Sequence, residues 1–326
     1  MAVYTDNDII ARSNNTAIEI PQEVASDVIK SATTSSVVMN LARKVTMSSK
    51  SYRQPVLSVL PDAYWVNGDT GLKQSTKVQW ESLSLTAEPL ATLVVVPDEF
   101  IDDSMIPIWS EVRPLIAEAF GRKIDNAALF GVNKPASWSD AVYQSAAKAG
   151  NYVEIGQNKG MVAGTAGSDL AVDVAQMGLT LANDGFNLSG FAAQPGFNWR
   201  LVGMRDTNGS PIYTNLAGDN RQGLYGVPFV ESRNGAWDNK TKLIGGDWSN
   251  AIVGIRQDMT FTMHTDAVIT DAAGAVQFNA MQQDSKIMRV VMRVGFAVAN
   301  PLTNLNTVKA SRSPFVLLTD DNSVGS

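Results

Sequence analysis

The stretch from Leu93 to Gly131 constrains the fold most, because it joins a strand to one long helix. Leu93 to Val96 are apolar and mostly β-branched, which predicts a strand covered on both faces, and Pro97 ends it because proline lacks an N–H donor. Farther on, apolar residues recur every three or four positions, as in the buried stripe of a helix that Gly131 ends: Ile108, Val112, Leu115, Ile116, Ala119, Phe120, Ile124 and Ala127.

Three features of this helix lead to specific expectations. Asp102, Asp103 and Ser104 precede it and are candidate N-caps. Pro114 removes one helical hydrogen bond, so the helix should either begin near Pro114 or bend there. The face opposite the apolar stripe has charges of both signs, which fit a solvated face or a subunit contact about equally well; they are Glu111, Arg113, Glu118, Arg122, Lys123 and Asp125.

Composition excludes several classes of protein. With 326 residues, 44% of them hydrophobic and 18% charged, the chain can form one large packed domain or two modest ones. A net charge of −6 argues against a protein whose task is to neutralise phosphates. The absence of cysteine excludes disulfides, thiolate metal sites and a cysteine nucleophile. With no secretory signal and no apolar run long enough to span a bilayer, we expect a soluble protein made in the cytoplasm, without membrane contact.

The region from Tyr52 to Val96 has strand composition but contains Pro55, Pro61 and Pro89, so its strands cannot all lie inside a sheet. The simplest solution is a protruding two-stranded ribbon with its tip at Asn67 to Gly71. Such a ribbon is marginally stable alone in water and must lie on another surface. The alternation of side chains changes phase between Trp80 and Leu83, which predicts a bulge there.

The rest of the chain indicates an α+β fold with irregular connections. A polar arm precedes Ile20 and Pro21, which open a helical stretch, and residues 132–168 look rich in loops. Further expected elements are a short apolar run over Val37–Val45, a helix over Asp169–Ala182, strands within Phe191–Pro195, Asn198–Gly203, Gly223–Val230 and Thr241–Trp248, a hairpin over Met259–Val276 and a long strand over Lys286–Val298.

Signatures of catalysis are weak. His264 is the only histidine and is expected at a strand end, so neither a multi-histidine metal site nor the usual nucleophilic triad can be built. Glycines from Gly160 to Gly167 lack the lysine of a phosphate-binding loop. An acidic group could hold a metal, but acids before a helix are more simply explained by its dipole; they are Asp98, Glu99, Asp102 and Asp103. We therefore expect no enzyme, cofactor or metal.

The order of these segments resembles the major capsid proteins of tailed bacteriophages, which have the Hong Kong 97-like capsid fold. The resemblance rests on motifs over nearly the whole chain: Ala17–Val45, Ala63–Asp69, Val94–Ser104 with the helix to Gly131, Gly226–Val230 and Leu243–Met259. It implies an N-terminal arm (residues 1–45), an extended loop (46–95), a peripheral domain with a spine helix (96–168), an axial domain (169–284), and a peripheral return strand with C-terminal tail (285–326).

The resemblance also implies surfaces between subunits. In the extended loop these are Tyr64, Trp65, Lys73, Lys77 and Trp80, and in the spine helix and arm they are Arg113, Glu118, Arg122, Ile20 and Pro21. Lys73 and Lys77 are expected to make ionic contacts rather than covalent cross-links. Pro114 would let the spine helix bend in an immature shell and straighten as the shell expands.

The implied function is a shell of hexamers and pentamers that encloses double-stranded DNA, contacted non-specifically, in a virion assembled in the host bacterial cytoplasm. Expected partners are further copies of the chain, a portal and, because only a short segment precedes Ile20, a separate scaffolding protein; a decoration protein is left open. Two alternatives are an encapsulin-like compartment with the same fold and a hydrolase using His264 with an aspartate.

Overall fold

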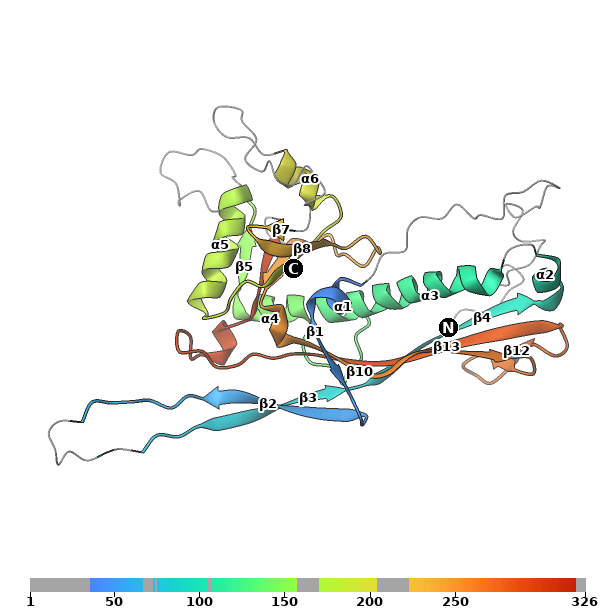
Figure 1. Ribbon diagram of the computed structural model, residues 1–326, viewed down its shortest axis with the longest axis horizontal. Coiled ribbons are helices and arrows are strands. Elements are labelled where there is room, and N and C mark those ends of the chain that lie inside the picture. The colour runs from blue at the N-terminus through green and yellow to red at the C-terminus, as the bar shows by residue number, and fades with distance from the viewer. Residues whose placement is uncertain are drawn as a thin grey trace. The chain divides into compact units, whose positions relative to one another are not determined.

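The computed structural model describes residues 36–66, 73, 75–104, 107–156, 170–203 and 223–320. They form two compact units (Figure 1). Unit 1 contains Glu88–Phe120 and Gln257–Val294; unit 2 contains the described parts of Thr34–Ala87, Gly121–Arg256 and Gly295–Ser326. Both helices and strands occur, so the predicted α+β class is confirmed.

Unit 1 is built on two long antiparallel strands, β4 (Glu88–Pro97) and β13 (Ser285–Val298). Their register runs from Ser285 opposite Pro97 to Val294 opposite Glu88, which confirms the predicted long C-terminal strand. Val95 and Val96 are buried, whereas Leu93 is 39% exposed. The expectation of a strand covered on both faces is therefore wrong at Leu93.

A small hairpin covers one end of this sheet. It pairs β11 (Val268–Thr270) with β12 (Val276–Asn279), and Phe278 packs with Val95 and Ile287. Asp271 forms the turn, because its Oδ1 accepts hydrogen bonds from the N–H groups of Ala273 and Ala275. The hairpin predicted over Met259–Val276 is wrong in its first limb, since Met259–His264 is the end of the long strand β10 (Ala251–His264).

Two helices follow β4: α2 (Asp98–Asp103) and α3 (Ile108–Asp125). Asp98 and Glu99 lie in the first turn of α2, where the dipole favours acids, and Asp102 and Asp103 end that same helix. The prediction that Asp102, Asp103 and Ser104 cap the long helix is therefore wrong, because the acids after Pro97 form a short helix of their own.

The long helix α3 begins at Ile108 and contains Pro114 in its interior, so it does not start near the proline. Ile116, Phe120 and Ile124 are buried as predicted, but Leu115 is 49% exposed and does not belong to the buried stripe. A π-helical turn over Asn126–Phe130 extends the helix to Gly131, which adopts the expected left-handed conformation with φ 75°.

A six-stranded sheet forms the core of unit 2, in the order β5-β14-β9-β6-β8-β7. Its strands are β5 (Tyr152–Glu154), β14 (Phe315–Thr319), β9 (Thr241–Gly246), β6 (Gly190–Ala193), β8 (Val227–Glu231) and β7 (Gly223–Leu224). Helix α5 (Leu170–Asn183) packs Val174, Met177 and Leu181 into this core, which confirms the helix predicted there.

Two predictions in unit 2 are wrong. The supposedly loop-rich stretch after residue 131 contains α4 (Val142–Ala149), whose buried Val142 and Ala146 lie four residues apart on one face, and also β5. The segment predicted as a strand over Asn198–Gly203 is α6 (Phe197–Val202). It starts after Gly196, whose positive φ of 81° turns the chain out of the sheet.

The predicted ribbon is present in unit 2 and extends away from the six-stranded sheet (Figure 1). It pairs β2 (Ser51–Val59) with β3 (Gln79–Thr86), while its predicted tip at Asn67–Gly71 lies outside the described residues. The register shifts between Leu57 and Val59, opposite Trp80 and Gln79, so the irregularity is in β2. The bulge predicted between Trp80 and Leu83 is wrong, because β3 pairs regularly there.

The segment before the ribbon forms α1 (Val37–Leu41) and β1 (Arg43–Thr46), which pairs in parallel with the start of β10. The predicted helix beginning at Ile20 and Pro21 lies outside the described residues. No helix among the described residues is both long and apolar enough for a membrane span.

Candidate assembly surfaces

The root of the ribbon is fixed in a small apolar core of unit 2. Met47, Leu85 and Ala87 pack there with Ile252 of β10, Ala297 of β13 and the following Ala299. Leu302 N–H donates a 3.0 Å hydrogen bond to the carbonyl of Leu57, and Lys309 forms an ion pair with Glu81. One end of the ribbon is thus held by both packing and hydrogen bonds.

Two glycines permit this close approach. A Cβ added at Gly295 would lie 2.7 Å from the carbonyl oxygen of Thr86, and one at Gly254 would lie 2.4 Å from Leu85 Cδ2 and Met47 Sδ. The Thr86 oxygen is backbone and cannot move away by a rotamer change. Gly295 therefore sets how closely the ribbon strand can lie on β13.

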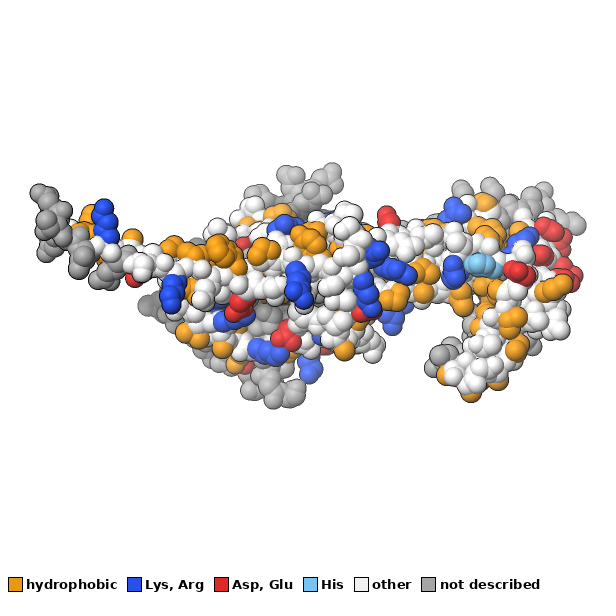
Figure 2. Space-filling view, turned by 90° about the horizontal axis from the view of Figure 1, so that it is seen from below, with side chains coloured by type: hydrophobic (Ala, Val, Ile, Leu, Met, Phe, Trp, Pro, Cys, Tyr) orange, Lys and Arg blue, Asp and Glu red, His pale blue; other side chains and the backbone are white. Residues whose placement is uncertain are grey.

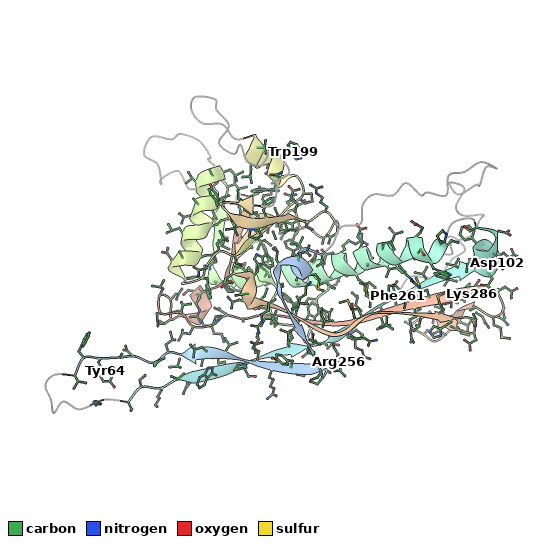
Figure 3. All side chains as sticks on the ribbon, in the orientation of Figure 1. Tyr64, Asp102, Trp199, Arg256, Phe261 and Lys286 are labelled. Atoms are coloured by element: carbon green, nitrogen blue, oxygen red, sulfur yellow. The ribbon has the colours of Figure 1, made fainter. Side chains whose placement is uncertain are left out.

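Beyond its root the ribbon is an exposed surface (Figure 2). Trp65 is fully exposed, Trp80 is 66% exposed and Tyr64 is 40% exposed. Figure 3 shows Tyr64 near the far end of the ribbon. Lys73 and Lys77 are also exposed. Large aromatic side chains in water are unusual and mark interaction surfaces when they gather together.

The buried end of α3 holds a carboxylate that joins three segments of unit 2. Asp125 Oδ1 accepts hydrogen bonds from Ser36 Oγ at 2.5 Å and from Val38 N–H at 3.0 Å. Its Oδ2 accepts from Asn234 Nδ2 at 2.7 Å and Val37 N–H at 3.0 Å. Asp125 thereby caps the N-terminus of α1 from another part of the chain.

Burial determines the electrostatics of this carboxylate. Asp125 is fully buried, and loss of solvation raises the pKa of its carboxyl above the ordinary 3.8, although the hydrogen bonds from Ser36, Val38, Asn234 and Val37 oppose that rise. The prediction that Asp125 belongs to a mixed-charge face open to solvent or to a subunit contact is therefore wrong. One turn earlier on α3, Gly121 leaves room for Ser36, whose Cβ would be 3.3 Å from a Cβ at that position.

The other charged residues of α3 remain near the surface. Within unit 1, the Arg113 guanidinium lies 5.4 Å from the ring centre of Phe261 on β10, a cation–π contact that ties the helix to the sheet. Arg122 is exposed and Glu118 is partly buried. The candidates Ile20 and Pro21 lie outside the described residues.

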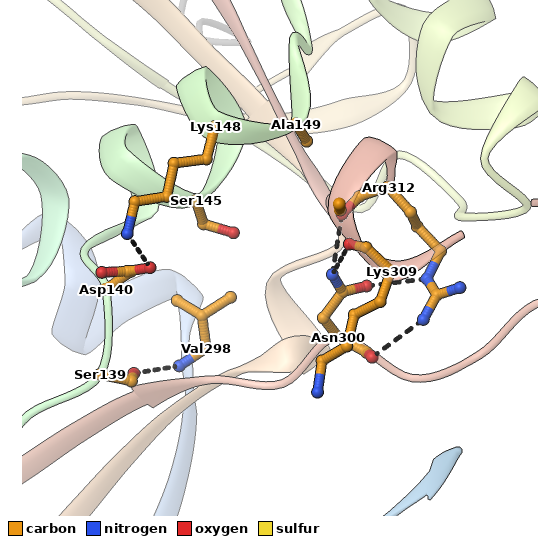
Figure 4. Close-up of a pocket in the computed structure, with 10 residues that line it drawn as sticks. Ser139, Asp140, Ser145, Lys148, Ala149, Val298, Asn300, Lys309 and Arg312 are labelled. Atoms are coloured by element: carbon orange, nitrogen blue, oxygen red, sulfur yellow. Dashed lines mark hydrogen bonds and ion pairs between the residues drawn. The ribbon is translucent and has the colours of Figure 1, made fainter. Parts of the chain in front are cut away.

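A cavity of about 360 Å³, lined mostly by residues with polar or charged side chains, lies in unit 2 between α4 and the C-terminal segment (Figure 4). Lys148 Nζ pairs with Asp140 at 2.6 Å, and buried Arg312 donates from Nε to Asn300 Oδ1 at 2.9 Å. Burial lowers the pKa of Arg312, and the negative charge of Asp184 opposes that shift. The cations that line the cavity already have partners, so nothing in the cavity singles out a ligand.

Residues considered for catalysis do not converge among the described residues. His264 ends β10, as predicted. Asp98, in the acidic group of α2, forms an ion pair with Lys286 at 3.3 Å. Within the described part of the chain, no group of three or more His, Asp or Glu side chains is placed to hold a metal ion. The Gly160–Gly167 stretch lies outside it.

The described residues thus form a projecting ribbon and a six-stranded core in unit 2 and a long antiparallel strand pair in unit 1. A family model described as "Phage capsid family" matches residues 17–303. The chain belongs to the phage capsid family. The resemblance to phage major capsid proteins seen in the sequence is thereby confirmed.

Individual phage proteins are similar to this chain over most of its length. The major capsid protein of Staphylococcus phage 80alpha is 22% identical over 294 residues, covering 89% of this chain and 85% of the relative. A solved chain from Microbacterium phage Oxtober96 has a TM-score of 0.80 and 33% identity, covering 96% of this chain and 99% of that one. One from Mycobacterium phage Bobi has a TM-score of 0.79, 27% identity and the same coverage.

Sequence reasoning missed the roles of Asp125 and Gly295. Asp125 lies directly after Ile124 and shortly before the apolar run Ala127–Phe130, a position where a solvated acid is unexpected. That signal could have indicated a buried, hydrogen-bonded carboxylate. Gly295 interrupts an apolar strand, which can mark close approach of another backbone.

Proposed function

We propose that this member of the phage capsid family is a major capsid protein, many copies of which assemble as hexamers and pentamers into an icosahedral shell around double-stranded DNA. Family membership supports a structural role in a virion. The single observation that carries the proposal is the ribbon, which is fixed at its root but keeps Trp65 and Trp80 in solvent. A neighbouring copy would cover these aromatic side chains.

The fold proposed for this role is the Hong Kong 97-like fold. Residues 1–45 would be its N-terminal arm, 46–95 its extended loop, 96–168 a peripheral domain with α3 as spine helix, 169–284 an axial domain, and 285–326 the return strand and tail. Support comes from the order of the elements, with the ribbon β2–β3 preceding α3 and the long β13 following the sheet-rich middle of the chain.

The proposed contacts between subunits use two groups of residues. Tyr64, Trp65, Lys73, Lys77 and Trp80 would lie against a neighbour from the ribbon. The other group comprises Arg113, Glu118, Arg122, Ile20 and Pro21 in the spine helix and arm. Exposure of Trp65, Arg113 and Arg122 supports these assignments.

Further partners would be a separate scaffolding protein, a portal and the packaged DNA. The net charge of −6 supports contact with DNA that is non-specific and weak, because few phosphates could be neutralised. Assembly would take place in the cytoplasm of the bacterial host. The relatives reported above are phage proteins, which favours a viral shell over an encapsulin-like compartment.

Negative-stain microscopy and sedimentation of the purified chain test the proposal. Shells of uniform diameter are expected, and particles recovered from infected cells should contain DNA and carry tails. A chain that stays monomeric at high concentration, with the ribbon resistant to protease, would contradict the proposal. Uniform shells filled with protein would instead identify a compartment, and hydrolytic activity of a monomer abolished by His264→Ala would identify an enzyme.

A further inference from the structure

Opposite charge predominates in the two units of the chain. The described part of unit 1 has four basic residues, Arg113, Lys286, Arg289 and Arg293, and eleven acidic ones, Glu88, Asp98, Glu99, Asp102, Asp103, Glu111, Glu118, Asp258, Asp266, Asp271 and Asp284. The described part of unit 2 has seventeen basic residues and eleven acidic ones, so its net charge is positive. A net charge of −6 for the whole chain conceals this separation.

The acidic charge of unit 1 is densest at α2. Four of its six residues are acidic, and Glu99 and Asp102 are exposed three positions apart, so they lie on one side of the helix. Lys286 pairs with Asp98, not with either of these two. Figure 2 shows acidic side chains gathered at the end of unit 1 that contains α2, and Asp102 is labelled there in Figure 3.

The projecting ribbon of unit 2 has the opposite charge. From residue 47 to residue 87 its described basic residues are Lys50, Arg53, Lys73 and Lys77, and its described acidic residues are Asp62 and Glu81. Glu81 is paired with Lys309 of the C-terminal segment. Lys73 and Lys77 are exposed and lie beyond the paired strands of the ribbon, with Lys77 three residues before the exposed Trp80.

We infer that the acidic helix α2 of one copy is the surface that receives Lys73 and Lys77 of the ribbon from a second copy. This inference rests on the proposed function, since it names the partner surface of the ribbon. Identical chains with a basic extension and an acidic patch at different places make a head-to-tail contact that can close into rings. Complementary charge steers such a contact and fixes its register.

Charge reversal with rescue tests the pairing. Lys73→Glu/Lys77→Glu and Glu99→Lys/Asp102→Lys are made separately and together in the full chain, and shell formation is followed by sedimentation and negative-stain microscopy. Each pair alone should raise the subunit concentration at half assembly by about tenfold, because attraction becomes repulsion. The combined variant should return to within about threefold of the parent, since the signs match again.

Lys148→Glu/Lys240→Glu, which reverses two lysines of unit 2 outside the ribbon, is the matched control and should assemble like the parent. Half assembly of the parent should also require more protein at about 1 M salt than at 0.15 M, because exposed charges are screened. A combined variant no better than its worse parent pair, or ribbon and α2 variants that assemble normally, would overturn the inference. A parent chain that forms no shells at all would overturn the proposed function itself.

Discussion

Asp125 at the end of α3 accepts a 2.5 Å hydrogen bond from Ser36, a residue 89 positions earlier in the chain. With the N–H groups of Val37 and Val38 and the amide of Asn234, this contact fixes the start of the described chain to the long helix. Gly121 provides the space for it. The carboxylate thus adds to the local cap of α1, in which Ser36 Oγ accepts a 3.1 Å hydrogen bond from Met39 N–H.

Asp125→Ala should destabilise the dispersed chain by about 3 kcal/mol, because Ser36 Oγ, two N–H groups and Asn234 Nδ2 lose their acceptor while buried. Urea unfolding followed by tryptophan fluorescence measures this change. Asp140→Ala, which removes an exposed carboxylate, is the control and should cost less than about 1 kcal/mol. Equal losses in the two variants would show that the Asp125 network contributes little.

The stability contributed by Asp125 should depend on pH. Because burial raises the pKa of this carboxyl, the folded chain binds the proton more tightly than the unfolded chain. The contribution of this carboxyl to the free energy of unfolding is therefore largest below pH 3.8. It falls as the pH rises from 3.8 through the folded-state pKa, and it stays constant above that pKa. Relative to Asp125→Asn, the parent should lose stability over that interval. A difference that stays constant from about pH 3 to about pH 7 would refute this.

Gly295→Ala should destabilise the ribbon root by about 1–3 kcal/mol, because the new Cβ would lie 2.7 Å from the Thr86 carbonyl oxygen. Thermal unfolding measures the loss, and hydrogen exchange of β3 amides shows whether it is local. Gly178→Ala is the matched control: nothing lies within 4 Å of its new Cβ, so in helix α5 it should stabilise by about 0.5–1 kcal/mol. Similar behaviour of the two variants would contradict the steric argument.

Trp65→Ala should leave the stability of the dispersed chain unchanged within about 0.5 kcal/mol, since the side chain is fully exposed. Its effect should appear only in assembly, where a buried aromatic anchor contributes about 2 kcal/mol or more. Shell yield against protein concentration measures this effect. Leu305→Ala, at an exposed apolar residue outside the ribbon, should assemble normally. Normal shells from the Trp65 variant would remove Trp65 from the proposed interface.

Pro114→Ala should restore an N–H donor inside α3 and favour a straight helix. If a bend at Pro114 belongs to the immature shell, the variant should expand at a changed rate or assemble in lower yield. Time-resolved scattering of particles during expansion measures both. Unchanged rates and yields would end the idea that this proline stores a bend, and Pro107→Ala, before the helix, provides the comparison.

The sequence by itself determined the elements whose signals are local. The apolar periodicity of Ile116, Phe120 and Ile124 predicted α3, the prolines and strand composition predicted the ribbon, and the run in Lys286–Val298 predicted β13. The order of these elements also indicated the family. Periodicity and turn chemistry act over a few residues, so they can be recognised without knowing the fold.

Only the tertiary structure decided the remainder. It placed Asp125, which looked like one member of a charged row, among donors from residues 36–38 and 234. It turned Asn198–Gly203 from a predicted strand into α6, and brought Thr86 against Gly295. Burial of a carboxylate, and the space that a missing side chain must leave, depend on segments distant in sequence, and local propensity has no information about those segments.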